Sequence, residues 1–250
     1  MKYLFRFILL LSILKSSAFT QVEKTRFQHL SVEDGLSQNS VTTIFQDSKG
    51  FMWFGTYDGL NKYDGYSFTT YRSNPKDPYS LSQNNVVAIF EDKQGNLWIG
   101  TENGLNIYDR DKDRFINFYA DSAHPNTITN YDIQSIVEDQ NGTLWLAVYG
   151  GGVNKITHFD GTEPVHDKIE VKNYKHDPAN PKSLNNNNVT YAFLDSKGGL
   201  WFGNDLGISK FNPLTEEFTH FKIDPNLINS RRIFITEDSF GYLWIQQYFS

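Results

Sequence analysis

The 250-residue sequence predicts an all-β protein, because it combines a repeated motif, short apolar segments and a high aromatic content. The motif Asp-x-x-Gly-x-x-Trp occurs five times, and the steps between its tryptophans are 45, 47, 56 and 43 residues. All five tryptophans of the chain stand in this motif. Aromatic residues make up 16% of the chain and favour pleated sheets. A recurring period of this length is typical of a repeat architecture.

Each repeat is predicted to hold four short strands. The first is apolar and ends at the Asp, as in 41–46, and a glycine turn then leads to a Trp-containing strand, as in 52–54. This second strand is apolar on both faces, so both faces are expected to be covered. A second glycine turn leads to the third strand, and the fourth, as in 67–71, alternates as a half-exposed strand does. Four strands in about 45 residues are the unit of a β-propeller, whose blades pack face to face.

We therefore expect about four complete blades and half of a fifth. The blades are predicted at about 41–71, 86–119, 132–174, 189–221 and 232–250, the last one truncated. Residues 25–30 are similar to a fourth strand, and we expect them to close the propeller as an outer strand of the last blade. The fifth repeat stops at Ser250 after its second strand, which would leave an apolar edge open. The sequence is thus expected to be the N-terminal part of a longer protein.

The motif residues are expected to be structural. Asp can cap its own turn, Gly accepts a positive φ, and a Trp flanked by apolar residues suits the contact between blades. Metal ligation by the Asp residues is the less favoured alternative, since the motif lacks the spacing of a calcium loop. Sugar stacking on the Trp residues is a second such alternative. The structural set is Asp47, Gly50, Trp53, Asp92, Gly95, Trp98, Asp139, Gly142, Trp145, Asp195, Gly198, Trp201, Asp238, Gly241 and Trp244.

Residues 1–18 are predicted to be a secretory signal peptide. Lys2 and Arg6 precede an apolar run, and Ser16 and Ala18 stand at positions −3 and −1 of a cleavage site. The run is too short for a stable membrane span, and an uncleaved anchor is the alternative. We therefore expect the chain to be exported and periplasmic.

The composition argues against several function classes. The net charge is −6 and no stretch supplies the basic face that a nucleic-acid partner requires. The absence of cysteine excludes disulfides, thiol catalysis and iron–sulfur clusters. The histidines lack metal-ligand spacing and there is no Gly-x-Ser-x-Gly elbow, so we predict no cofactor, no metal and no catalytic residue. A carboxylate pair assembled from different blades is left open.

The repeats resemble those of the two-component regulator propeller family. The resemblance rests on the run Gln-Asp-Ser-Lys-Gly-Phe-Met-Trp-Phe-Gly-Thr at 46–56 and on Gly-Leu-Asn-x-Tyr-Asp at 59–64 and 104–109. It covers residues 25–250 and looks like the opening of the sensor portion of hybrid two-component histidine kinases of the Bacteroidetes type. Ala147 and Gln246 depart from the pattern, because each replaces the glycine that follows the Trp strand.

The resemblance implies a non-enzymatic, extracytoplasmic propeller that senses a ligand for two-component signal transduction. It implies that the full-length protein is dimeric and anchored in the inner membrane, with histidine kinase activity only in a later part. Family members often respond to oligosaccharides, so an oligosaccharide is the expected ligand. A secreted propeller-fold glycan lyase or glycosidase and a protein-binding scaffold are the alternatives.

Ligand contacts are expected on the loops of one face, where amide, carboxylate and aromatic side chains together suit a neutral polyol. Asn is also common in turns for conformational reasons, which is the alternative explanation. The turns between second and third strands carry Tyr57, Asp58, Glu102, Asn103, Tyr149, Asn204 and Asp205, and the blade linkers carry Asn39, Asn85, Tyr131, Asn188 and Arg231.

Overall fold

The computed structural model describes residues 27–121, 123–124, 126–130, 132–159, 169–222 and 233–247. The expected signal peptide over residues 1–18 lies outside this range. Residues 31–250 form one compact unit and residues 1–30 belong to another. Residues 27–30 are described and carry no strand, so the closing strand expected at 25–30 stays a prediction.

The unit formed by residues 31–250 confirms the all-β fold and its organisation into blades. It starts with a short 3-10 helix, η1 (Val32–Asp34), and continues into antiparallel sheets whose strands follow one another in sequence order. The first sheet holds β1 (Val41–Gln46), β2 (Met52–Thr56), β3 (Gly59–Tyr63) and β4 (Phe68–Tyr71), and the second holds β5 (Val86–Glu91), β6 (Leu97–Thr101), β7 (Gly104–Asp109) and β8 (Arg114–Phe118). The third holds β9 (Ile133–Glu138), β10 (Leu144–Val148), β11 (Gly152–Phe159) and β12 (Ile169–Tyr174), and the fourth holds β13 (Val189–Leu194), β14 (Leu200–Asn204), β15 (Gly207–Asn212) and β16 (Glu217–Lys222). A fifth sheet is described as two strands, β17 (Ile233–Glu237) and β18 (Leu243–Gln247).

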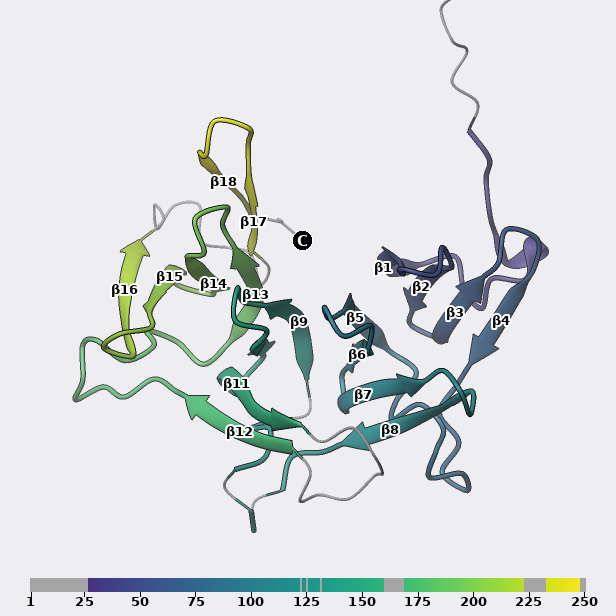
Figure 1. The fold of residues 1–250 in the computed structure, drawn as a ribbon, viewed down its shortest axis with the longest axis horizontal. Coiled ribbons are helices and arrows are strands. Elements are labelled where there is room, and N and C mark those ends of the chain that lie inside the picture. Colours follow the sequence, from purple (N-terminus) through teal and green to yellow (C-terminus); the bar gives the residue numbers. More distant parts are fainter. Residues whose placement is uncertain are drawn as a thin grey trace, which may run out of the picture. The chain divides into compact units, whose positions relative to one another are not determined.

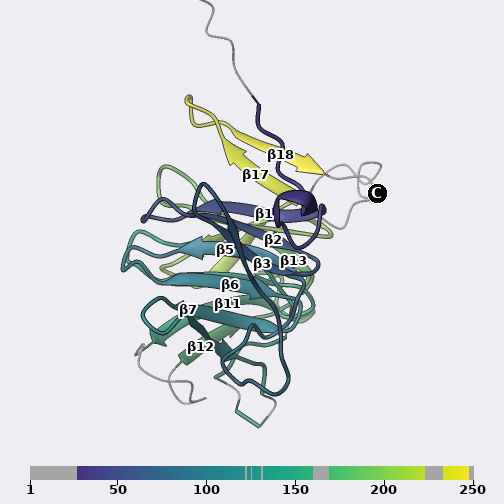
Figure 2. The same ribbon diagram turned by 90° about the vertical axis from the view of Figure 1, so that its right-hand side faces the viewer.

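The first strands of successive sheets lie next to one another (Figure 1). β1 contacts β5, β5 contacts β9, β9 contacts β13, and β13 contacts β17. In the side view of Figure 2, the sheet of β5–β8 lies between the sheet of β1–β4 and the sheet of β9–β12. The sheets therefore stack face to face around their first strands, as blades do, and in the described residues they do not close into a ring.

Stacking covers both faces of the Trp-containing second strands, as their lack of polar alternation predicts. Every residue of β6 and β10 is buried. The apolar clusters cross from one sheet to the next: Trp53 packs with Leu97 and Phe115, and Trp145 packs with Phe202. Burying a large apolar side chain contributes about 2 kcal/mol, so these contacts are a main source of stability.

The glycine after the Trp strand lets the next sheet approach closely. A Cβ at Gly100 would lie 2.6 Å from the carbonyl oxygen of Ile133, in the first strand of the following sheet. A Cβ at Gly203 would lie 3.0 Å from the Cβ of Ile233, again in the following first strand. Ala147 takes this place in the third sheet and is fully buried. Where a following sheet covers this position, the space thus admits at most a methyl group.

A β-bulge recurs in the first strand of each four-stranded sheet. The pairing register with the second strand shifts at Thr42, Val87, Gln134 and Thr190. A bulge adds one unpaired residue, bends the strand and redirects side chains out of the regular alternation.

The linkers before the first strands dock through a buried amide. The third strand of each of the first three sheets carries an Asn that is fully buried, and its Oδ1 accepts a backbone N–H from the linker. The N···Oδ1 distances are 2.9 Å for Ser37 and Asn61, 2.8 Å for Ser82 and Asn106, and 2.9 Å for Thr129 and Asn154. In the fourth sheet Ser209 replaces the strand Asn, and Asn185 of the linker supplies the amide, with Oγ and Oδ1 3.1 Å apart.

A carboxylate from the next sheet holds the turn between first and second strands. Glu91 accepts hydrogen bonds from the backbone N (2.6 Å) and Oγ (2.9 Å) of Ser48. Glu237 does the same for Ser196, at 2.6 and 2.8 Å. In the fourth sheet Leu194 stands at the position of this carboxylate. The turn of the third sheet therefore lacks the equivalent contact with the fourth sheet.

We expect Gly100→Ala to destabilise the protein by about 1–3 kcal/mol, because the new methyl group must push back the backbone of Ile133. Gly203→Ala is the matched variant, since its closest approach is 3.0 Å, to the Cβ and Cγ2 of Ile233, and is less severe than the 2.6 Å at Gly100. Urea unfolding would measure both. Equal stability of the two variants, or no loss in Gly100→Ala, would show that close approach does not explain the glycine.

Candidate functional site

The Asp and Trp of every repeat are joined by a hydrogen bond. The carboxylate Oδ1 also accepts two backbone N–H groups of the turn; in the first repeat these come from Lys49 and Phe51, both at 3.0 Å. The indole Nε1 to Oδ2 distances are 2.9 Å for Trp53 and Asp47, 2.8 Å for Trp98 and Asp92, 3.0 Å for Trp145 and Asp139, 2.8 Å for Trp201 and Asp195, and 2.8 Å for Trp244 and Asp238. Each carboxylate therefore already serves three donors, which suits a structural role and not metal binding.

Burial of the indoles depends on the following sheet. Trp53, Trp98 and Trp145 are at most 1% exposed, Trp201 is half-buried and Trp244 is 62% exposed. The exposure of Trp244 differs from the expected position between blades, since among the described residues no further sheet covers β18.

The first of these Asp residues carries an additional ion pair with the second sheet. Arg110 donates from Nη1 to Asp47 at 2.7 Å and from Nη2 to Glu91 at 2.8 Å. Burial alone would raise the pKa of Asp47, but the hydrogen bonds from Arg110 and Trp53 outweigh it and hold this pKa below its usual range. The carboxylate of Asp47 is thus ionised at neutral pH.

Tyrosine–acid pairs join the outer strands of two neighbouring sheets. Asp113 accepts hydrogen bonds from the hydroxyls of Tyr71 (2.6 Å) and Tyr108 (2.5 Å), and Glu216 accepts one from Tyr174 (3.1 Å). Burial, together with the hydrogen bond to Asp113, raises the pKa of Tyr108 to about 12. Both acids adopt a positive φ, 49° for Asp113 and 56° for Glu216, which strains a non-glycine residue.

The loops that the sequence places on one face do lie side by side. We call this surface the rim: the β2–β3, β6–β7, β10–β11 and β14–β15 turns and the linkers that precede β1, β5, β9 and β13. The backbone N of Glu102 donates to the carbonyl of Asn85 at 3.2 Å, and that of Tyr149 donates to the carbonyl of Asp132 at 3.0 Å. Turn and linker are therefore held together by backbone hydrogen bonds in the second and third sheets.

Several rim side chains are already engaged within the structure. Asp58 forms an ion pair with Arg72 at 2.9 Å, and Asn188 donates from Nδ2 to Asp205 at 2.5 Å. Asn204 is 1% exposed and takes part in docking the linker. These groups hold the rim in shape and are less available to a ligand.

Other rim side chains remain accessible. Tyr57 is 53% exposed, Glu102 and Asn103 are exposed, and Tyr149 is half-buried. Asn85 is 9% exposed, and its Oδ1 has no hydrogen-bond partner in the described part of the chain. Among the remaining candidates, Asn39 is exposed but accepts the backbone N–H of Val32 at 3.0 Å, whereas Tyr131 and Arg231 lie outside the described residues.

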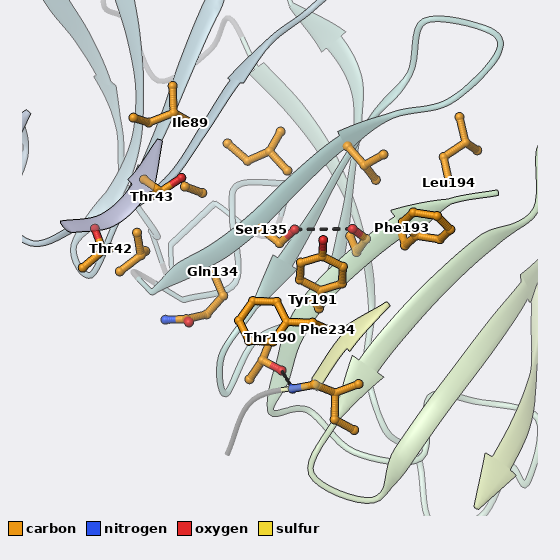
Figure 3. Close-up of a pocket in the computed structure, with 16 residues that line it drawn as sticks. Thr42, Thr43, Ile89, Gln134, Ser135, Thr190, Tyr191, Phe193, Leu194 and Phe234 are labelled. Carbon is orange, nitrogen blue, oxygen red and sulfur yellow. Dashed lines mark hydrogen bonds between the residues drawn. The ribbon is translucent and has the colours of Figure 1, made fainter. Parts of the chain in front are cut away.

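A cavity of about 420 Å³ lies between the first strands, and the sequence analysis did not identify it. Every one of β1, β5, β9, β13 and β17 contributes to its lining, so we call it the central cavity. Figure 3 shows the side chain of Gln134 extending from its strand, with Thr42 on one side and Thr190 on the other. Tyr191 contacts Phe234 edge to face, with ring centroids 5.3 Å apart.

The lining of the central cavity contains no charged side chain among the described residues. Its polar groups are hydroxyls and one carboxamide, supplied by Thr42, Thr43, Gln134, Ser135, Thr190 and Tyr191. In the sequence, this site is indicated only by polar residues inside otherwise apolar first strands, as at Thr42, Gln134 and Thr190.

Two features are absent from the described residues. No group of three or more His, Asp or Glu side chains is placed to hold a metal ion. No helix in the described part of the chain is long and apolar enough to cross a membrane.

The sequence profile of the two component regulator propeller family matches residues 35–58, 80–103, 127–150 and 183–205. Each match begins in a linker, runs through the first and second strands and ends in a rim turn. These segments are two-component regulator propeller repeats. In two-component systems such propellers form a non-catalytic part, so the repeats carry no kinase core.

The comparisons with characterised proteins agree with this assignment. Histidine kinase P4 of Formosa agariphila is 46% identical over 74 residues, which is 30% of this chain and 5% of that protein. The extracellular domain of a protein described as a hybrid two component system from B. thetaiotaomicron is 26% identical with a TM-score of 0.72, over 88% of this chain and 29% of that one. A second such domain from the same organism is 28% identical with a TM-score of 0.68, over 89% of this chain and 31% of that one. This chain thus spans less than a third of the length of each of these proteins.

We expect Asp47→Asn to lower the free energy of unfolding by about 2 kcal/mol at pH 7, because an amide has one acceptor oxygen and cannot serve Arg110 and Trp53 as well as the two backbone N–H groups of the turn. The lowered pKa of Asp47 means that its carboxylate stabilises the fold above the unfolded pKa of about 3.9, and that this contribution is lost as pH falls through the folded pKa. The difference between wild type and variant is therefore expected to persist from pH 7 to 5 and to shrink below about pH 4.

Urea unfolding at several pH values would measure the difference. Asp238→Asn is the matched control, since the same bond to Trp244 is exposed there and its loss is expected to cost less. A difference that stays constant down to pH 3, or an equal cost in the control, would contradict the role of the buried carboxylate.

Proposed function

We propose that this chain is the extracytoplasmic, ligand-sensing propeller of a hybrid two-component signal transduction protein. The observation that carries the proposal is the match of four linker–strand–strand–turn repeats to the regulator propeller family, together with the likeness to extracellular domains of hybrid systems. The full-length protein would be a dimeric histidine kinase in the inner membrane, with this propeller in the periplasm. Ligand binding would act by favouring one of two signalling states.

The ligand that we propose is an oligosaccharide bound at the rim. Tyr57 offers an exposed ring for stacking against a sugar face, and Asn103 and Glu102 offer groups for hydroxyls. The unpartnered Oδ1 of Asn85 belongs to the linker whose backbone is bonded to the turn of Glu102. A buried acceptor without a partner is costly unless a ligand or water satisfies it.

The proposal as a whole is tested in the bacterium that produces the protein. Transcription of the genes that the system controls is measured during growth on a panel of polysaccharides, with the wild-type protein and with the propeller deleted. We expect one polysaccharide to raise transcription only when the propeller is present. A response without the propeller would contradict the proposal. Release of new sugar ends by the purified protein would favour a lyase or glycosidase, and a protein partner without glycan affinity would favour a scaffold.

The rim is tested by Tyr57→Ala and Asn103→Ala. We expect each variant to weaken binding of oligosaccharides from the inducing polysaccharide about tenfold or more, since stacking and hydrogen bonds are lost. Isothermal titration calorimetry would measure this. Tyr66→Ala is the matched control, because Tyr66 is 95% exposed in the β3–β4 turn, at the opposite end of the same sheet. Unchanged affinity in both rim variants would place the ligand elsewhere.

A further inference from the structure

The central cavity is lined in part by positions that differ from one repeat to the next. All five first strands can be aligned on the motif Asp that follows them. At the third residue before that Asp the strands carry Ile44, Ile89, Ile136, Ala192 and Ile235, so this position is aliphatic throughout. The position six residues before the Asp is also aliphatic in each four-stranded sheet, as Val41, Val86, Ile133 and Val189.

The positions five and four residues before the motif Asp lie between these two aliphatic positions and differ from sheet to sheet. They are Thr42-Thr43, Val87-Ala88, Gln134-Ser135, Thr190-Tyr191 and Ile233-Phe234. These are the positions that every first strand contributes to the cavity. The chemistry of the lining therefore differs from repeat to repeat at these two positions, while the aliphatic positions on either side stay constant.

The backbone is irregular at the same positions. The bulges fall at the first of the two variable positions in all four complete sheets. Bulges redirect side chains and are over-represented next to functional sites. In each four-stranded sheet the bulged residue and the residue after it both line the cavity.

We propose that the central cavity binds a small, uncharged molecule that presents hydroxyl groups and one apolar face, of the size of a mono- or disaccharide. The volume of about 420 Å³ lies within the range of small-molecule pockets. A lining without charges would leave an ionised ligand desolvated and unpaired, so it selects against acidic and basic molecules. The proposal goes beyond the sensor function, because it concerns a site apart from the rim and holds whether or not the rim binds a glycan.

Two side chains have defined roles in this site. Tyr191 offers a half-buried ring, braced by Phe234, against the apolar face of the ligand. Among the described residues no group hydrogen-bonds the Tyr191 hydroxyl, and burial raises its pKa, so a neutral phenol is free to donate to a ligand hydroxyl. Gln134 extends its carboxamide toward the same space (Figure 3). Its Nε2 donates to Asp132, which leaves Oε1 to accept from the ligand.

The test is isothermal titration calorimetry on the full-length protein with glucose, galactose, xylose, maltose, cellobiose and lactose, and with glucuronic acid as the charged comparator. We expect at least one neutral sugar to bind and glucuronic acid not to bind. Tyr191→Phe keeps the ring and removes only the hydroxyl, so it is expected to weaken binding about two- to tenfold. Gln134→Ala is expected to weaken binding by a similar factor.

The controls separate this site from the rim. Tyr66→Phe removes an exposed hydroxyl far from the cavity and is expected to leave binding unchanged. Thermal unfolding of Tyr191→Phe, expected near the wild-type midpoint, establishes that the variant is folded. Loss of binding in Tyr57→Ala with none in Tyr191→Phe and Gln134→Ala would overturn the cavity site and leave the rim proposal standing. No binding of any neutral sugar, or equal binding of glucuronic acid, would also overturn it.

Discussion

Each sheet of this protein is apolar on both faces and depends on its neighbours to cover it, and the Trp of the repeat lies at that contact. Its one polar atom, the indole N–H, would be costly to bury without a partner, by about 1–3 kcal/mol. The Asp six residues earlier supplies the partner and at the same time closes the hairpin turn. One carboxylate therefore links a local event, the formation of a turn, to a tertiary one, the burial of Trp between sheets. This coupling explains why Asp, Gly and Trp recur together at a fixed spacing.

The linkers also contribute to stability. A linker docks on its own sheet through a buried amide, and in the fourth sheet the amide and the hydroxyl exchange places between Asn185 and Ser209, which preserves the contact. The linkers also cover the outer edges of the sheets: the carbonyl of Tyr79 accepts the backbone N–H of Phe115 at 2.8 Å, and the carbonyl of Lys182 accepts that of Phe218 at 2.8 Å. An uncovered outer strand is open to pairing with other chains, so this contact protects the edge.

Most of the fold could be predicted from the sequence because its determinants are local and repeated. Strand type, turn glycines and the face-to-face packing of sheets all follow from periods within one unit. Contacts between units could not be predicted this way. The hydrogen bond from Ser48 to Glu91 joins residues 43 positions apart, and no local pattern in either segment indicates the other as its partner. The ligand contacts of the rim stay a prediction, and the sequence did not reveal that Asp58 is paired with Arg72. The central cavity was missed because five first strands that are far apart in the sequence form it together, so no single repeat reveals it.

Departure from the repeat is not by itself a sign of function, as the outer strands demonstrate. The position facing the third-strand leucine or its equivalent is Tyr71 in the first sheet, Phe118 in the second and Tyr174 in the third. Both tyrosines pair with an acid of the following sheet, so their hydroxyls are satisfied and the variation has a structural cause. The hydroxyl of Tyr191 differs, because it faces a cavity and the described residues offer it no partner. A hydroxyl that the fold leaves free beside a cavity is available to a ligand, which the hydroxyls of Tyr71 and Tyr174 are not.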